Sequence, residues 1–80
     1  MRNRFIQNIE GKILNKKFRQ LKNIFLPFDI CEIEIQTNNN SKRNIELYGA
    51  DAREINSYYK IGYNIKVIKQ FLGDYMLVRD

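Results

Sequence analysis

The sequence predicts a mostly β domain made of five strands and one short helix. Three patterns in its 80 residues lead to this fold class. Apolar and polar residues alternate over residues 28–37, with the period of a strand that is buried on one face. After the polar, turn-rich residues 38–43, a second alternating run over residues 44–48 completes an antiparallel hairpin. After Gly49 the pattern changes to that of a short helix, which a further hairpin follows.

The alternation assigns two faces to the first hairpin. One face carries the apolar residues Cys31, Ile33, Ile35, Ile45 and Leu47. The opposite face carries Glu32, Glu34, Gln36, Asn44, Glu46 and Tyr48. We therefore expect the apolar face to line the core and Tyr48 to lie outside it.

The short helix has a start signal and a stop signal. Asp51, followed three residues later by Glu54, has the form of an N-cap and its capping-box partner. Lys60 suits the negative end of the helix dipole, and Gly62 can adopt the left-handed conformation that ends a helix. The apolar residues at helical spacing are Ala52, Ile55 and Tyr58 or Tyr59. The pattern predicts a helix of about two to three turns.

The last part of the chain predicts a second hairpin. Ile65 and Val67 alternate with polar residues and begin a strand. Gly73-Asp74 is a turn signal, and the alternating residues 75–79 follow it. We expect these two strands to pair with each other.

Residues 4–25 fit two structures. Ile9 and Ile13 flank Gly11, which permits a long, bent strand of the kind that begins a small barrel. A helix ending before Pro27 would instead gather Ile6, Ile9, Ile13, Phe18, Leu21 and Phe25 near one face. Gly11 and the asparagines at positions 8, 15 and 23 disfavour the helix, because glycine costs about 1 kcal/mol relative to alanine. Periodicity alone leaves an alternative fold class open, α+β with an N-terminal helix before a ββαββ unit.

Length and composition indicate one domain over residues 1–80. A chain of this size builds a single modest core, and 44% hydrophobic residues suffice to fill it. The one cysteine, Cys31, has no partner for an internal disulfide, which favours a reducing cytoplasm. The sequence has neither a signal-peptide core nor a run of about eighteen apolar residues, so we expect no secretion and no membrane partner.

Positive charge is concentrated at the N-terminal end. Residues 1–22 contain seven lysines and arginines and the single acid Glu10, whereas residues 23–80 contain seven bases and eight acids. Such asymmetry attracts polyanions such as nucleic acids, because each neutralised phosphate releases condensed counterions. A net charge of +5 is also ordinary for the solvated surface of a small domain, so charge alone leaves both interpretations open.

The sequence lacks the residue types and spacings that most catalytic sites need. It contains no histidine, and a lone cysteine on a core-facing position offers neither a zinc site nor an activated nucleophile. Glu32 and Glu34 share a strand face, but a solvated face explains them better than a general acid–base pair. A glycine-rich phosphate loop is also absent. We therefore expect a protein that is not an enzyme and that uses no metal or cofactor.

A run of residues from the third predicted strand to the fourth follows a known family pattern. The run is Leu47-Tyr48-Gly49, then Ala52, Tyr58 and Gly62, then Ile65-Lys66-Val67. It resembles the third strand, helix and fourth strand of the single-stranded DNA-binding protein family. Residues 9–13 and 28–37 look like the first two strands of that family. The resemblance implies a five-stranded oligonucleotide/oligosaccharide-binding (OB) barrel over residues 1–80, and it favours a strand in the ambiguous first segment.

The resemblance also implies a binding residue. In the family, the aromatic residue that ends the third strand stacks on a base, and Tyr48 holds this position here. Outside the core, Tyr48 would alternatively cover the barrel rim. Phosphate contacts would come from Lys12, Lys16, Lys17, Arg19, Lys22, Lys42 and Arg43. Phe18 lies among these bases and fits either a strand-binding groove or the core.

Three acids work against phosphate binding on the face of Tyr48. They are Glu32, Glu34 and Glu46, and their carboxylates would repel a phosphate backbone. Pairing with Lys12 and Lys16 on the neighbouring strand would neutralise them.

The leading hypothesis is a small non-catalytic module that binds single-stranded DNA or RNA, largely independently of sequence, in replication or repair. The alternative is an OB module for protein–protein interaction, such as a phage or mobile-element accessory factor with a replication or phage protein as its partner. A homo-oligomer would pair through the first strand, with Ile6, Leu14 or Leu26 in the seam. The sequence does not separate DNA from RNA.

Overall fold

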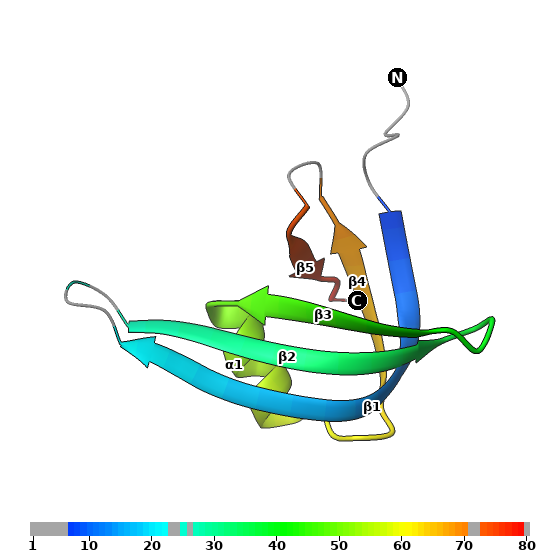
Figure 1. The fold of residues 1–80 in the computed structure, drawn as a ribbon, viewed down its shortest axis with the longest axis horizontal. Helices are drawn as coiled ribbons and strands as arrows, with labels where there is room; N and C mark the ends of the chain where they lie inside the picture. The colour runs from blue at the N-terminus through cyan, green and yellow to red at the C-terminus, as the bar shows by residue number, and fades with distance from the viewer. Residues whose placement is uncertain (1–6, 23–24, 26, 71–72, 80) are drawn as a thin grey trace.

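The computed structural model describes residues 7–22, 25, 27–70 and 73–79. Its elements are, in chain order, β1 (Gln7–Lys22), β2 (Pro27–Thr37), β3 (Lys42–Tyr48), α1 (Ala50–Tyr58), β4 (Asn64–Lys69) and β5 (Tyr75–Leu77). The strands form one antiparallel sheet in the order β3-β2-β1-β4-β5 (Figure 1). This mostly β architecture with one short helix confirms the predicted fold class at that level.

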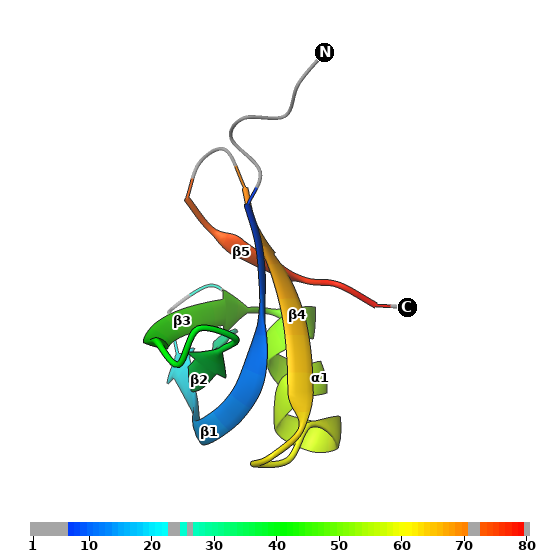
Figure 2. The same cartoon turned by 90° about the vertical axis from the view of Figure 1, so that its right-hand side faces the viewer.

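β1 belongs to both layers of the fold. Its residues 7–12 pair with β4, and its residues 11–22 pair with β2. The register with β2 shifts between Ile13 and Asn15, as at a β-bulge. The strand curves from the layer of β4 and β5 into the layer of β2 and β3, as the two views show (Figure 1, Figure 2).

The helix considered for residues 4–25 is wrong over the described part of that segment. Ile9, Gly11 and Ile13 are buried in alternation with exposed neighbours, which is the period of a strand. The apolar spacing fitted a helix as well, but backbone pairing with two other strands decides the structure. Those partners lie far away in the sequence, so local periodicity could not reveal them.

Gly11 stands where three strands meet. It pairs with Thr37 of β2 and with Ile65 of β4. A Cβ at this position would lie 2.4 Å from the carbonyl oxygen of Gln36, which is closer than a non-bonded contact allows. Glycine therefore permits the close approach of β1 to β2 at the bend, as the sequence predicted.

The first hairpin has the faces that its alternation predicted. Cys31 lies opposite Leu47, and Ile33 lies opposite Ile45. All four side chains are buried. Tyr48 is exposed on the other face, at the end of β3.

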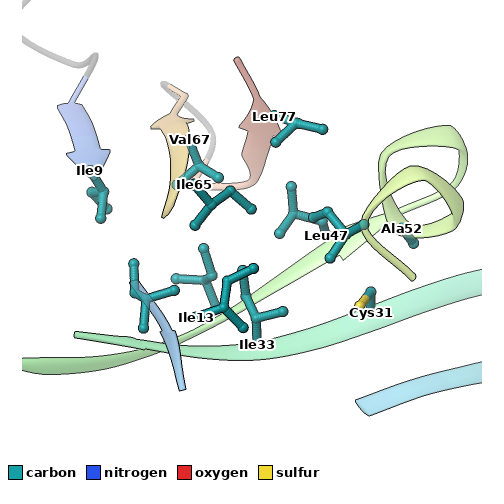
Figure 3. Close-up of a cluster of buried hydrophobic side chains, with 12 residues drawn as sticks. Ile9, Ile13, Cys31, Ile33, Leu47, Ala52, Ile65, Val67 and Leu77 are labelled. Carbon is teal, nitrogen blue, oxygen red and sulfur yellow. The ribbon is translucent and has the colours of Figure 1, made fainter. Parts of the chain in front are cut away.

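The core lies between the two layers of strands, with α1 at its side (Figure 3). Its buried members are Ile9, Ile13, Cys31, Ile33, Ile35, Ile45, Leu47, Ala52, Ile55, Ile65, Val67 and Leu77. Every strand and the helix contribute at least one of them. Phe18, Tyr59 and Tyr75 are partly buried and pack against this cluster. Phe18 therefore takes the core position that the sequence left open.

The two edges of the sheet are β3 and β5, and these edges lie close to each other. Strand pairing among the described residues does not join them, so the sheet is open and a closed barrel is not shown. β5 is three residues long, and each of its residues pairs with β4. The second hairpin is thus shorter than the predicted residues 75–79.

The capping box predicted at the start of α1 is wrong. The N-cap residue is Gly49, at φ 65°, and no side chain caps the helix there. Asp51 lies inside the first turn and accepts hydrogen bonds from the backbone N–H of Leu77 at 3.0 Å and from Arg79 at 2.7 Å. Glu54 also forms an ion pair with Arg79, at 2.6 Å. Both acids hold the end of the second hairpin instead of capping the helix.

The end of α1 also differs from the prediction. The helix ends at Tyr58, before Lys60 and Gly62. The ammonium group of Lys16 in β1 donates hydrogen bonds to the carbonyl oxygens of Ile55 and Asn56 in the last turn, at 3.4 Å and 3.1 Å, and to that of the C-cap residue Tyr59, at 2.7 Å. Lys16 thus supplies the positive charge that we expected from Lys60. Within the part of the chain that the structure describes, no helix has the length and hydropathy to cross a membrane.

Candidate nucleic-acid interface

The side of β1, β2 and β3 that faces away from the core forms the outer face. Residues paired across antiparallel strands point to the same side, so the register arranges this face in rows. Going along the strands, the rows are Lys12, Gln36 and Lys42; Asn15, Glu34 and Asn44; Lys17, Glu32 and Glu46; Arg19, Ile30 and Tyr48; Leu21 and Phe28. One end of the outer face is therefore basic, its middle is acidic and polar, and its other end is apolar and aromatic.

The aromatic end of the outer face carries an exposed ring stack. The rings of Phe28 and Tyr48 are 5.4 Å apart at their centroids and 17° from parallel. Phe28 is 44% exposed and Tyr48 is 38% exposed, so both rings are accessible to a ligand. Ile30, in the same row as Tyr48, is only 4% exposed. We call Phe28 and Tyr48 the aromatic platform.

Glu46 connects the aromatic platform to an arginine. The phenol of Tyr48 donates a hydrogen bond to Glu46 Oε1 at 2.6 Å, and Arg19 Nη2 lies 3.3 Å from Glu46 Oε2. The hydrogen bond from Tyr48 is the main cause that lowers the pKa of Glu46, and the charge of Arg19 lowers it too. The same hydrogen bond raises the pKa of Tyr48. Glu46 is thus an ionised acceptor held between two groups that suit a nucleotide.

Five of the nine predicted binding residues lie on the outer face. They are Lys12, Lys17, Arg19, Lys42 and Tyr48. Lys12 and Lys42 share the basic row, about 20 Å from the row of Tyr48 at ~3.3 Å per residue. Lys17 lies across from Glu32, next to Arg19 and its partner Glu46.

The other four predicted residues lie elsewhere. Lys16 binds the end of α1, and Phe18 packs against the core. Lys22 is at the exposed end of β1, and Arg43 pairs with Ile35, on the core-facing side of β3. The predicted pairing of Lys16 with the outer-face acids is wrong, because its ammonium group reaches the helix carbonyls instead. Arg19, not Lys16, forms the ion pair with Glu46.

Sequence reasoning missed Phe28 as a member of the site. The signal was present, because Phe28 has the same parity as Glu32 and Glu34 along β2. Parity alone did not reveal the site, because the contact of Phe28 with Tyr48 depends on the register between β2 and β3.

Of the three residues predicted for an oligomer seam, Leu14 lies half-buried at the bulge of β1, whereas Ile6 and Leu26 lie outside the described residues.

A groove lies beside the aromatic platform, between β3 and the turn that joins β4 to β5. Tyr48, Glu46 and Glu32 line it on the side of the outer face. Asp74 and Tyr75 line it on the side of the second hairpin. The groove therefore offers aromatic surface and carboxylate oxygens together.

The described residues contain no group of three or more histidine, cysteine or acidic side chains that could hold a metal ion. Cys31 is fully buried, and its burial raises the pKa of the thiol. Its surroundings are those of a core residue.

Comparisons with known proteins identified no relative of this chain. A scan against protein-family models found no matching family, and searches of curated proteins and of solved structures found no match. The resemblance to the single-stranded DNA-binding proteins stays a prediction from the sequence.

Proposed function

We propose that this protein is a small, non-catalytic module that binds single-stranded nucleic acid by aromatic stacking and phosphate contacts, largely independently of sequence. The exposed stack of Phe28 on Tyr48, with Arg19 in the row of Tyr48, carries the proposal. Stacking of a base on an exposed aromatic ring is worth about 1–3 kcal/mol and accepts any base. A guanidinium beside the ring can bind the phosphate of the same nucleotide.

The strand arrangement supports an OB barrel as the scaffold of this module. Five antiparallel strands, a bent β1 shared by two layers and a helix between β3 and β4 fit that fold. OB barrels are often only partly closed, and they bind oligonucleotides on the face of their second and third strands. The aromatic platform belongs to β2 and β3, so in an OB barrel it would lie on that face.

Four cations on the outer face would supply the phosphate contacts. Lys12, Lys17, Arg19 and Lys42 extend along the strands from the basic row to the aromatic platform. A single strand following this path would cover a site on the order of 4–16 nucleotides, as in other OB folds. DNA replication and repair, which expose single strands, are processes in which such a module would act.

The direct test is fluorescence anisotropy of a labelled single strand of about thirty bases, titrated with the protein at several salt concentrations. Each phosphate contact contributes about −0.7 to the slope of log K against log salt, so four contacts predict a slope near −3. Absence of binding at low salt would refute the proposal. Binding that does not change with salt would refute the role of the four cations.

A protein partner is the second candidate. Tyr58, Ile61 and Tyr63 are each exposed and lie within six residues of one another at the α1–β4 connection, outside the strands that form the outer face. Apolar side chains gathered on a surface are typical of protein interaction sites. A phage or replication protein that copurifies in stoichiometric amount, from a chain that binds no single strand, would favour this function. A homo-oligomer that pairs through β1 remains part of this second proposal.

A further inference from the structure

The groove beside the aromatic platform differs in charge from the rest of the outer face. Three of its lining residues are the acids Glu32, Glu46 and Asp74, and none of its lining residues is a lysine or arginine. A phosphate group would be repelled there, whereas the basic row and Arg19 lie outside the lining. If a single strand crosses the outer face, its backbone must follow the cations, and the groove is left for a base.

The aromatic surface of the groove suits a base ring. Tyr48 forms part of its lining and belongs to the aromatic platform. Tyr75 lines it from the second hairpin. A base lying against Tyr48 would place its hydrogen-bonding edge among the carboxylates of the groove.

The acids of the groove differ in the hydrogen bonds that their carboxylates already accept. Both oxygens of Glu46 accept hydrogen bonds, one from Tyr48 and one from Arg19. Asp74 is exposed in the turn between β4 and β5, and it lines the groove from the side of the second hairpin, whereas Tyr48 lines it from β3. Among the described residues, Asp74 accepts no side-chain hydrogen bond that would have to be broken for a base, so it is the carboxylate of the groove that we assign to the base edge.

The bases differ in what they offer to a carboxylate. Guanine presents two neighbouring donors, N1–H and the 2-amino group, which match the two oxygens of one carboxylate. Thymine and uracil present a single N–H between two carbonyl oxygens, and a carboxylate repels those oxygens. A pocket of carboxylates therefore selects guanine over thymine or uracil.

We propose that this groove is a base subsite that prefers guanine, with the base stacked on Tyr48 and its Watson–Crick edge donating to Asp74. The inference rests on the proposed function and adds one selective position to an otherwise sequence-tolerant surface. Glu46 holds Tyr48 in place within this subsite.

The test compares three oligonucleotides of about fifteen bases by anisotropy. All are oligothymidylate, with a central thymine, guanine or hypoxanthine, and hypoxanthine lacks the 2-amino group. We expect guanine to bind about tenfold more tightly than thymine, within the range of a bidentate base contact, and hypoxanthine to lie between them. Equal affinity for the three strands would overturn the inference and leave the proposed function standing. Failure of all three to bind would overturn both.

A matched pair of variants locates the subsite. Asp74→Asn should reduce the preference for guanine to less than about twofold, because the amide offers one acceptor instead of two. Glu34→Gln is the control, since Glu34 lies on the outer face but does not line the groove. Its preference for guanine should stay unchanged. A full preference in Asp74→Asn, or equal losses in both variants, would overturn the assignment of the subsite to this groove.

Discussion

A single carboxylate, that of Glu46, holds two of the side chains proposed to meet a nucleotide. It accepts a hydrogen bond from Tyr48 and forms an ion pair with Arg19. For Arg19 the carboxylate occupies the place that a phosphate would take. A bound strand must therefore compete with Glu46 for the guanidinium group.

Glu46→Gln should bind single strands more tightly than the wild-type protein. The change removes a negative charge from the outer face and releases Arg19 from its ion pair. The gain should be about twofold to fivefold, because an exposed ion pair contributes about 0.2–1 kcal/mol. Anisotropy with oligothymidylate at low salt measures it. Weaker binding by the variant would show that Glu46 contributes to affinity by positioning Tyr48.

Asp29 links stability to pH at the residue scale. It is a buried acid whose carboxylate accepts hydrogen bonds from Arg53 at 2.6 Å and Gln20 at 2.7 Å. The bond from Arg53 is the main cause that holds the pKa of Asp29 below its usual value. The stability that the ionised group contributes is therefore present above the unfolded pKa of about 3.9 and is lost as the pH falls through the folded pKa.

Asp29→Asn should consequently lower the melting temperature at pH 7 and have a smaller effect near pH 3. At the lower pH the wild-type carboxyl group begins to protonate and loses the same interaction. Thermal unfolding followed by circular dichroism at both pH values measures the difference. An equal difference at the two pH values would contradict the role of the charge on Asp29.

At the scale of elements, the bend of β1 organises the fold. The strand passes from the layer of β4 to the layer of β2 within a few residues, and Gly11 permits the close approach there. The layer of β2 and β3 then carries the aromatic platform on its outer face. The geometry of the candidate site therefore depends on the bend.

Gly11→Ala should destabilise the protein by about 1–3 kcal/mol, as overpacking in a tightly packed interior does. The added methyl group would meet the backbone carbonyl of Gln36, which cannot move without disturbing the pairing of β1 with β2. Urea unfolding of the variant and of the control Lys12→Ala, at an exposed neighbouring position, measures the effect. Equal stability of the two variants would contradict the close approach.

Lys16 connects β1 to the end of α1, and we expect this contact to stabilise the fold. Its ammonium group contacts the carbonyl end of α1, so Lys16→Met should cost about 0.5–2 kcal/mol, as a charge at a helix C-terminus does. Binding of single strands should change little, whereas Lys42→Met should weaken binding and lower the salt dependence. If Lys16→Met lost as much affinity as Lys42→Met at unchanged stability, Lys16 would contact the bound strand and the prediction would be wrong.

Local patterns predicted the elements whose partners are nearby, and failed where distant contacts decide. The faces of β2 and β3 followed from alternation, and this placed Tyr48 outside the core. The choice between strand and helix in β1 required its pairing with β4, which lies far along the chain. Asp51 had the form of an N-cap, but the backbone of Leu77 and the side chain of Arg79 bind it instead. Phe28 entered the site only through the register of β2 with β3.

At the scale of the whole molecule, the second hairpin is fixed against the helix. Arg79 forms ion pairs with Asp51 at 2.7 Å and Glu54 at 2.6 Å, and Asp51 also accepts from the backbone of Leu77. These contacts fix the end of β5 against α1, and β5 lies beside the edge of β3. The outer face and the groove share Glu32, Glu46 and Tyr48, so they form one continuous surface.

The central claim is that single strands bind on this surface, and residue-resolved NMR tests it most directly. Amide chemical shifts of the labelled protein are followed while an oligothymidylate of about ten bases is added. The proposal predicts the largest changes at Phe28, Ile30 and Tyr48, with smaller changes along the basic row and none at Tyr58 or Ile61. Changes confined to the α1–β4 connection, or no changes at any amide, would contradict it.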